Sequence, residues 1–237
     1  MKRKVYYGIL ILIIIIVITG GILFKKNILS AEDSMSNLIN KTLNIDKNSS
    51  NDVVSTVEGQ PIYKKDLEIA ELFDKTRVEN QNKFIELNSE VKISPARQKT
   101  RKELLDELIE RKAIMEVAKK EGYIVTKKEA ENYYNNIQNT INDILNGKIK
   151  GNVEDAKKAK ELLDLYKSNL SEDEFKEKII GAYQEILTIS KYFKAKTDEY
   201  IKSHPNATND EINQFVDSLK KNIKSSTRIE VKDPELQ

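Results

Sequence analysis

The residues best suited to acid–base and nucleophilic chemistry are scarce, since the 237-residue sequence contains one histidine and no cysteine. His204 stands before Pro205 in a polar stretch, which indicates an exposed loop residue rather than a metal ligand or a general base. Without cysteine the chain can form no disulfide, thiolate metal site, cysteine nucleophile or lipid-modified cysteine. The sequence therefore predicts no metal centre and no catalysis by either residue type.

Carboxylates are abundant, and a pair of them could serve as general acid and base. Those near residue 100 alternate with Lys and Arg at the spacing of a helix surface, which predicts solvated faces. They are Glu103, Asp106, Glu107 and Glu110. The sequence also lacks a phosphate-binding GxxxxGK loop, an HExxH zinc motif and an acidic calcium loop. We therefore expect no cofactor and no enzyme active site.

Aromatic side chains offer a different chemistry, the binding of apolar segments of other polypeptides. If residues 126–147 and 153–170 form a projecting pair of antiparallel helices, an exposed aromatic face there could hold an unfolded client. The candidate client-binding residues are Tyr133, Tyr134, Ile137 and Tyr166. The alternative is that these side chains simply pack the two helices against each other.

Charge is distributed unevenly between the beginning of the chain and the rest. Residues 1–26 contain five basic residues and no acidic one, whereas the other 211 residues contain 35 basic and 38 acidic side chains. A slightly acidic body with evenly mixed signs is a poor binder of polyanions, because phosphate neutralisation needs a concentrated basic face. We therefore exclude nucleic acid as a partner.

Residues 5–24 carry no charge, and 13 of the 17 residues from Gly8 to Phe24 are Ile, Leu, Val or Phe. This run spans about 30 Å as a helix, the thickness of a bilayer core, and its composition favours insertion by roughly 4–8 kcal/mol. The basic residues at positions 2–4 place the N-terminus in the cytoplasm and the body outside it. A cleaved signal peptide ending at Leu29-Ser30-Ala31 is the alternative to this signal-anchor, and it exports the body too.

The remaining sequence predicts mostly helices. Residues 27–52 are rich in Asn, Ser, Asp and Lys and indicate a spacer, and the β-branched residues 53–57 predict a strand. Helices are expected over residues 64–88 and over residues 94–121, where Ser94-Pro95 is a typical helix start. Gly122 is expected to end the second of these helices.

Three capping boxes predict the starts of later helices. They begin at Thr126, Ser171 and Thr208, and a further helix is expected over residues 153–170. Residues 227–231 alternate apolar and polar side chains, which predicts a second strand. The expected fold is all-α, with a two-stranded ribbon that pairs the first and last strands of the body.

Two stretches resemble a known family. Residues 57–67, Val-Glu-Gly-Gln-Pro-Ile-Tyr-Lys-Lys-Asp-Leu, resemble the V-N-G-x-x-I-T-x-x-D-L motif of SurA- and PrsA-type extracytoplasmic chaperones. Residues 105–129 resemble the helix–turn–helix of that family, L-D-x-L-I followed by A-x-x-x-G-I-x-V-T-x-x-E. The resemblance implies the SurA N-terminal-like helical domain, in which the first and last strands pair, over roughly residues 53–231.

The chain also departs from this family. Members usually carry a parvulin-type prolyl isomerase domain before the last helix, and the link between residues 200 and 209 has no room for one. Gram-positive members are commonly lipoproteins, which a cysteine-free chain cannot be. Glu58 replaces the usual Asn, and Tyr63 stands where Thr or Ser would cap a helix. Isomerase activity is therefore not expected.

These inferences define three regions: a signal-anchor in residues 1–26, a spacer in 27–52 and a SurA N-terminal-like domain in 53–237. The leading hypothesis is an ATP-independent holdase in the cell membrane of a Gram-positive bacterium, which assists newly exported, unfolded polypeptides without isomerase activity. The second hypothesis is a dedicated adaptor for one envelope protein. A prolyl isomerase is the third.

Overall fold

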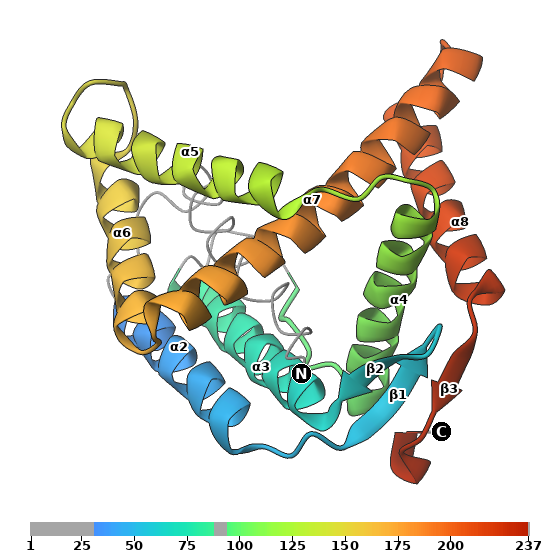
Figure 1. Cartoon of the computed structure of the whole chain (residues 1–237), viewed down its shortest axis with the longest axis horizontal. Helices are drawn as coiled ribbons and strands as arrows, with labels where there is room; N and C mark the ends of the chain where they lie inside the picture. The colour runs from blue at the N-terminus through green and yellow to red at the C-terminus, as the bar shows by residue number, and fades with distance from the viewer. Residues whose placement is uncertain (1–30, 88–93, 237) are drawn as a thin grey trace.

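The computed structural model describes residues 31–87 and 94–236, and this part of the chain is mainly helical (Figure 1). Its helices are α2 (Ala31–Asn48), α3 (Lys64–Leu87), α4 (Arg101–Lys120), α5 (Lys127–Leu145), α6 (Val153–Ser168), α7 (Glu172–Ser203) and α8 (Asn209–Ser226). Its strands are β1 (Val53–Val57), β2 (Gln60–Tyr63) and β3 (Ile229–Val231), and a 3-10 turn, η2 (Pro234–Leu236), follows β3. The predicted mainly helical fold is confirmed.

Two apolar cores share the helix α7. The first, which we call the hairpin core, joins α2, α5, α6 and the first half of α7 around Leu163, Ile179 and Tyr183. The second, the sheet core, joins the strands, α3, α4, α8 and the second half of α7 around Leu67 and Tyr192. Figure 1 shows α7 running diagonally across the molecule, with α5 and α6 near its beginning and α4 and α8 near its end.

The linker between α4 and α5, residues 121–126, is bound to the middle of α7. The backbone N–H of Val125 donates to the Thr188 hydroxyl at 2.9 Å, and the Gln184 amide donates to the Val125 carbonyl at 2.8 Å. Thr188 is completely buried, so the Val125 bond is shielded from water. These two bonds fix the point at which the chain passes from the sheet core to the hairpin core.

The strands form an antiparallel sheet in the order β2-β1-β3. The predicted pairing of the first and last strands is confirmed, because Thr56 lies opposite Glu230 in this sheet. The prediction of only two strands is wrong, since β2 adds a third. Pro61 in β2 made this stretch look like a turn, yet β2 is an edge strand, where the missing N–H of proline costs no ladder bond.

The turn between β1 and β2 explains the glutamate at the position where the similar family has asparagine. Glu58 and Gly59 have φ angles of +51° and +77°, and positive φ at both central residues suits a tight hairpin turn. Left-handed backbone costs a residue such as Glu58 about 1 kcal/mol. Its carboxylate offsets this cost by accepting hydrogen bonds from the Arg228 N–H at 2.9 Å and the Lys120 ammonium at 3.1 Å.

The prediction of a spacer over residues 27–52 is wrong for residues 31–48, which form α2. Leu38, Ile39 and Leu43 of this helix are buried, and α2 packs against α3 and α6. Few apolar residues stand among many Asn and Lys residues, so the helical pattern is weak. Packing against two neighbouring helices provides the stability that local sequence does not.

The predicted start of a helix at Ser94 is also wrong, because α4 begins at Arg101 with Thr100 as its N-cap. Thr100 and Glu103 form a capping box, which is the stronger start signal. The predicted capping boxes at Thr126, Ser171 and Thr208 are confirmed. Gly122, at a φ angle of +82°, follows the last residues of α4 as predicted.

The predicted signal-anchor over residues 5–24 and the alternative cleavage site at residues 29–31 lie wholly or mainly outside the described residues, as does the predicted end of the third helix at Asn88. Within residues 31–87 and 94–236, no helix is both long and apolar enough to cross a membrane.

The two candidate starts of α4 give a direct stability test. Thr100→Ala removes the side chain that accepts the Glu103 N–H bond, so we expect it to lower the free energy of unfolding by about 1 kcal/mol. Ser94→Ala at the predicted but incorrect start should change it by less than about 0.5 kcal/mol. Urea denaturation of both variants measures the difference, and equal effects would contradict the assignment.

Candidate functional site

The four predicted client-binding residues lie on α5 and α6 but differ in exposure. Tyr166 is buried, with 5% of its surface exposed, and Tyr134 and Ile137 pack against the hairpin core as partly buried side chains. Tyr133 alone of the four is exposed, at 39%. Three of these residues therefore serve the packing of helices, which was the alternative interpretation of the pattern.

Aromatic rings join α5, α6 and α7 in a continuous cluster. The ring of Tyr134 lies 6.2 Å from Phe175 and 6.0 Å from Tyr183, and the ring of Tyr166 lies 5.9 Å from Phe175. Such pairs contribute about 0.5–1.5 kcal/mol each beyond the burial of their area. Burial raises the pKa of the Tyr183 phenol and of the Tyr134 phenol, so both stay neutral donors. These ring contacts fix the helix pair α5–α6, which we call the α5–α6 hairpin, against α7.

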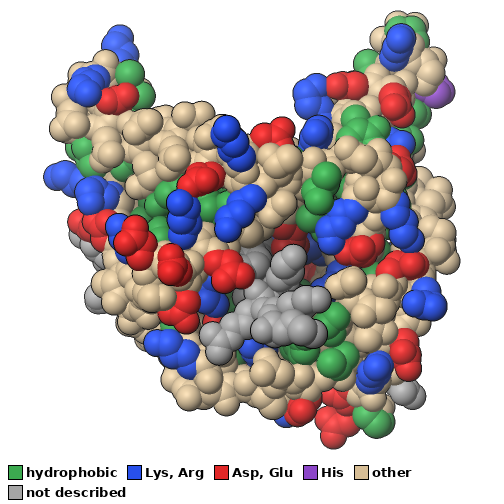
Figure 2. Space-filling view, in the orientation of Figure 1, with side chains coloured by type: hydrophobic (Ala, Val, Ile, Leu, Met, Phe, Trp, Pro, Cys, Tyr) green, Lys and Arg blue, Asp and Glu red, His purple; other side chains and the backbone are tan. Residues whose placement is uncertain are grey.

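Four more apolar side chains are exposed like Tyr133, and they stand singly on different elements. The large hydrophobic residues classed as exposed in the described ranges are Ile124, Tyr133, Ile149, Val153 and Ile201, each between 39% and 46%. Figure 2 shows two projections on one edge of the molecule; they are the α5–α6 connection and the end of α7 with the beginning of α8 (Figure 1). Ile149 and Val153 belong to the first projection, and Ile201 belongs to the second.

The other two exposed residues belong to the part of the chain between the projections. The Tyr133 ring lies 5.4 Å from Tyr183 of α7. Ile124 precedes Val125, whose backbone is hydrogen-bonded to Gln184 and Thr188 of α7, one and five residues after Tyr183. Both therefore lie beside the middle of α7. We use the name recess for the two projections together with the surface between them, since the five residues belong to these parts of the chain.

A group of largely buried charges occupies the junction of α2, α3, α4 and α7, and no spacing in the sequence predicts it. Burial raises the pKa of Asp66 to about 7, although the Tyr63 N–H donates to its carboxylate at 2.8 Å. Lys112, whose pKa is lowered by burial, donates to the Pro61 carbonyl at 2.7 Å. Asp46 pairs with Lys65 at 3.3 Å and with Lys178 at 2.5 Å. These contacts connect helices rather than forming an open site.

The remaining candidates for chemistry have structural partners. His204 is the exposed C-cap of α7 and stacks on Tyr200, with ring centroids 4.3 Å apart. Two of the four carboxylates near residue 100 pair with α8, Asp106 with Lys224 and Glu110 with Lys220, and Glu107 pairs with Lys99 of the segment before α4. Glu103 caps α4, and its hydrogen bond to Arg97 lowers its pKa to about 2. Among the described residues, no group of three or more His, Asp or Glu side chains is placed to hold a metal.

Comparison of the chain with models of protein families, with curated proteins and with solved structures yields no match.

Removing tyrosines from α5 and α6 separates packing from surface roles. Tyr166→Ala should lower the free energy of unfolding by about 3 kcal/mol, because it leaves a cavity between α6 and α7. Tyr133→Ala should lower it by less than about 1 kcal/mol, because that side chain is exposed. Thermal and urea unfolding check both values; a large loss for Tyr133→Ala would show that this tyrosine also belongs to the core.

The charge of Asp66 predicts a pH dependence of stability. An unfolded aspartate has a pKa near 4, so between pH 4 and 7 the folded state binds more protons and its stability falls as pH rises. Asp66→Asn abolishes this dependence. From pH 5 to pH 8 the variant should gain about 2 kcal/mol of unfolding free energy relative to the wild type. The matched control is Asp217→Asn, which makes the same substitution at an exposed aspartate of α8.

Proposed function

We propose that this protein is an extracytoplasmic, membrane-anchored holdase that binds newly exported, unfolded polypeptides without ATP and without prolyl isomerase activity. The observation that carries the proposal is the location of the exposed apolar side chains, since the large hydrophobic residues exposed in residues 31–87 and 94–236 all belong to α5, to its two connections, to the beginning of α6 or to the end of α7. The resemblance of residues 57–67 and 105–129 to SurA- and PrsA-type chaperones supports it. So does the pairing of β1 with β3, which that resemblance implies.

The form of the recess suits weak, multi-point binding. Its apolar side chains stand singly, so each can bury only part of its surface against a client and contributes on the order of 1 kcal/mol. Several such contacts together hold an unfolded segment, and each one exchanges quickly. A holdase with many clients needs this combination, because tight binding to a single sequence would prevent release.

A second function, a dedicated adaptor for one envelope protein, is favoured by the burial of Tyr134, Ile137 and Tyr166. With these side chains in the core, the recess offers less apolar surface than the sequence predicted. Crosslinking from the recess in living cells separates the two functions. Many heterogeneous products favour the holdase, and one stoichiometric product favours the adaptor.

Aggregation of an unfolded enzyme tests the holdase. We expect the full chain in nanodiscs, at fivefold molar excess and without ATP, to halve the light scattering of chemically unfolded rhodanese after dilution. Ile124→Ser with Tyr133→Ser should reduce this protection at least twofold, because both apolar contacts beside α7 are lost. Lys128→Ser with Asn132→Ser changes exposed polar residues of the same helix and serves as the control.

If the wild type does not protect rhodanese against aggregation, the holdase proposal is overturned. If the two double variants protect it equally, the recess is not the surface that binds rhodanese. Acceleration of prolyl isomerisation in a standard peptide assay would contradict the proposed lack of isomerase activity.

A further inference from the structure

The 94–99 segment, which lies between α3 and the start of α4, is fastened to α3 by side chains that bond to its backbone. The amide of Asn82 accepts the Ala96 N–H at 3.0 Å and donates to the Ala96 carbonyl at 3.5 Å. Arg77 donates to the Arg97 carbonyl at 3.1 Å, and Asp74 accepts the Lys99 N–H at 2.7 Å. Gln81 donates to the Ser94 carbonyl at 3.4 Å. Four side chains of one helix therefore hold five backbone groups.

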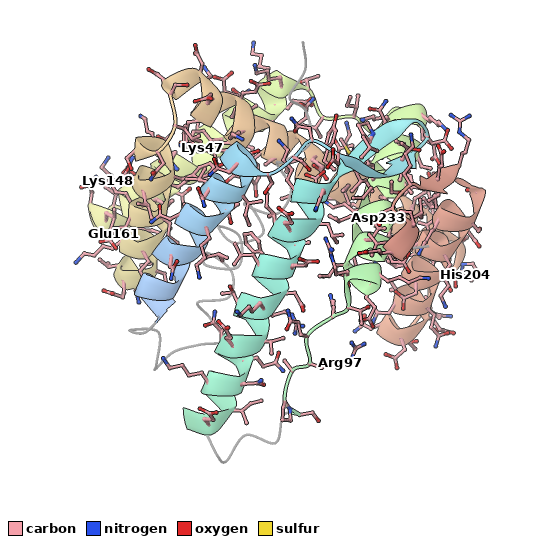
Figure 3. The ribbon with its side chains drawn as sticks, turned by 90° about the horizontal axis from the view of Figure 1, so that it is seen from below. Lys47, Arg97, Lys148, Glu161, His204 and Asp233 are labelled. Atoms are coloured by element: carbon pink, nitrogen blue, oxygen red, sulfur yellow. The ribbon has the colours of Figure 1, made fainter. Side chains whose placement is uncertain are left out.

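The geometry is that of a strand-like chain laid antiparallel on a helix face. The bonding positions of α3 ascend from 74 to 82 while those of the segment descend from 99 to 94. Residues 74–82 rise by about 12 Å along the helix, and six residues of extended chain span about 15 Å. The two lengths match closely enough for each bond to form without a turn. Figure 3 shows the coil that carries Arg97 running beside α3.

The beginning of α4 lies on the other side of the segment and contributes two carboxylates, while its basic Arg101 is paired with Glu71 of α3. Arg97 of the segment pairs with Glu103 at 2.5 Å, and Lys99 pairs with Glu107 at 2.5 Å. Only Ala96 and Lys99 of the segment are half-buried, and its other residues are exposed. The groove between the two helices thus holds a backbone through α3 and two basic side chains, spaced two residues apart, through α4.

We propose that this α3–α4 groove is a binding site for extended, basic segments of other polypeptides, and that the 94–99 segment is its built-in occupant. Backbone bonds do not depend on the sequence bound, and the two carboxylates select Arg or Lys at alternate positions. The groove is a different surface from the recess, and the inference stands whether or not the recess binds clients.

Exchange of the occupant is energetically accessible. The segment buries little apolar surface, so its attachment depends on hydrogen bonds of about 1 kcal/mol each and on two exposed ion pairs of similar or smaller value. An incoming segment with the same pattern replaces every one of these bonds. The cost of exchange is then mainly the advantage that covalent attachment gives to the built-in occupant.

The test weakens the attachment of the 94–99 segment to α3 and measures the affinity of the α3–α4 groove for an added peptide. Ala96→Pro removes the N–H that Asn82 accepts, so it should weaken the occupant and raise the affinity of the full chain for an added peptide at least fivefold. Gln98→Pro is the matched control, since the Gln98 N–H donates to none of the four α3 side chains. Adding Asn82→Ala to Ala96→Pro should cancel the gain.

The probe is the fluorescein-labelled peptide Gly-Ser-Pro-Ala-Arg-Gln-Lys-Gly, measured by fluorescence anisotropy with the full chain in nanodiscs. The same peptide with Glu in place of Arg and Lys should bind at least fivefold more weakly, because Glu103 and Glu107 repel it. In the wild type, the Ala96 and Lys99 amides should lose hydrogen-exchange protection when the basic peptide is added. Circular dichroism confirms that each variant is folded.

Equal affinities of the Ala96→Pro and Gln98→Pro variants, with no change in amide protection, would overturn the inference and leave the 94–99 segment a simple connection. The holdase proposal is judged separately by rhodanese aggregation. Suppression of aggregation without peptide binding would contradict the proposed groove alone. Peptide binding without suppression of aggregation would contradict the proposed holdase function alone.

Discussion

The participation of one helix in two cores is the constraint on which the rest of the structure depends. The 32 residues of α7 extend for about 48 Å, and Ile179 and Tyr183 enter the hairpin core while Tyr192 enters the sheet core. Between them, Gln184 and Thr188 bind the linker at Val125. Because a helix is stiff over this length, the distance and direction between the two projections are set by α7. Ile124 and Ile149 of the recess lie in connections, and the packing of helices on α7 positions these connections.

This arrangement explains why the tyrosines of α5 and α6 are more useful inside than outside. A projecting pair of helices with an open aromatic face would be held only by its connection to α7. With Tyr134 and Tyr166 packed around Phe175, the hairpin is fixed, and single apolar residues at its end and along its side can be presented at constant positions. Ion pairs join α2 to its neighbours in addition. A partly buried carboxylate such as Asp46 would be unfavourable in isolation, but Asp46 pairs with lysines of α3 and α7 and so joins α2 to both helices.

Local signals were predictable from sequence, and signals that depend on distant partners were not. A capping box such as Thr126 to Glu129 is complete within four residues, so its pattern is sufficient to identify it. The helix α2 and the edge strand β2 owe their existence to neighbours, and their own sequences argue for a spacer and a turn. The true start of α4 was missed because Ser94-Pro95 matches a start pattern, whereas the backbone there is bonded to α3.

The exposure of an aromatic residue on an amphipathic helix is also a question of neighbours. Tyr133 and Tyr134 are adjacent in sequence, and a helix turns by 100° per residue, so the two side chains cannot both point to the centre of the buried face. The periodicity of α5 alone cannot say which, because residues 130, 134, 137 and 141 form one acceptable stripe and 133, 137, 141 and 144 form another. The position of α7 decides, since both rings contact its Tyr183, but only Tyr134 also contacts Phe175, and 39% of Tyr133 stays exposed. A surface assigned to binding must therefore be read from the assembled helices, as both the recess and the α3–α4 groove are.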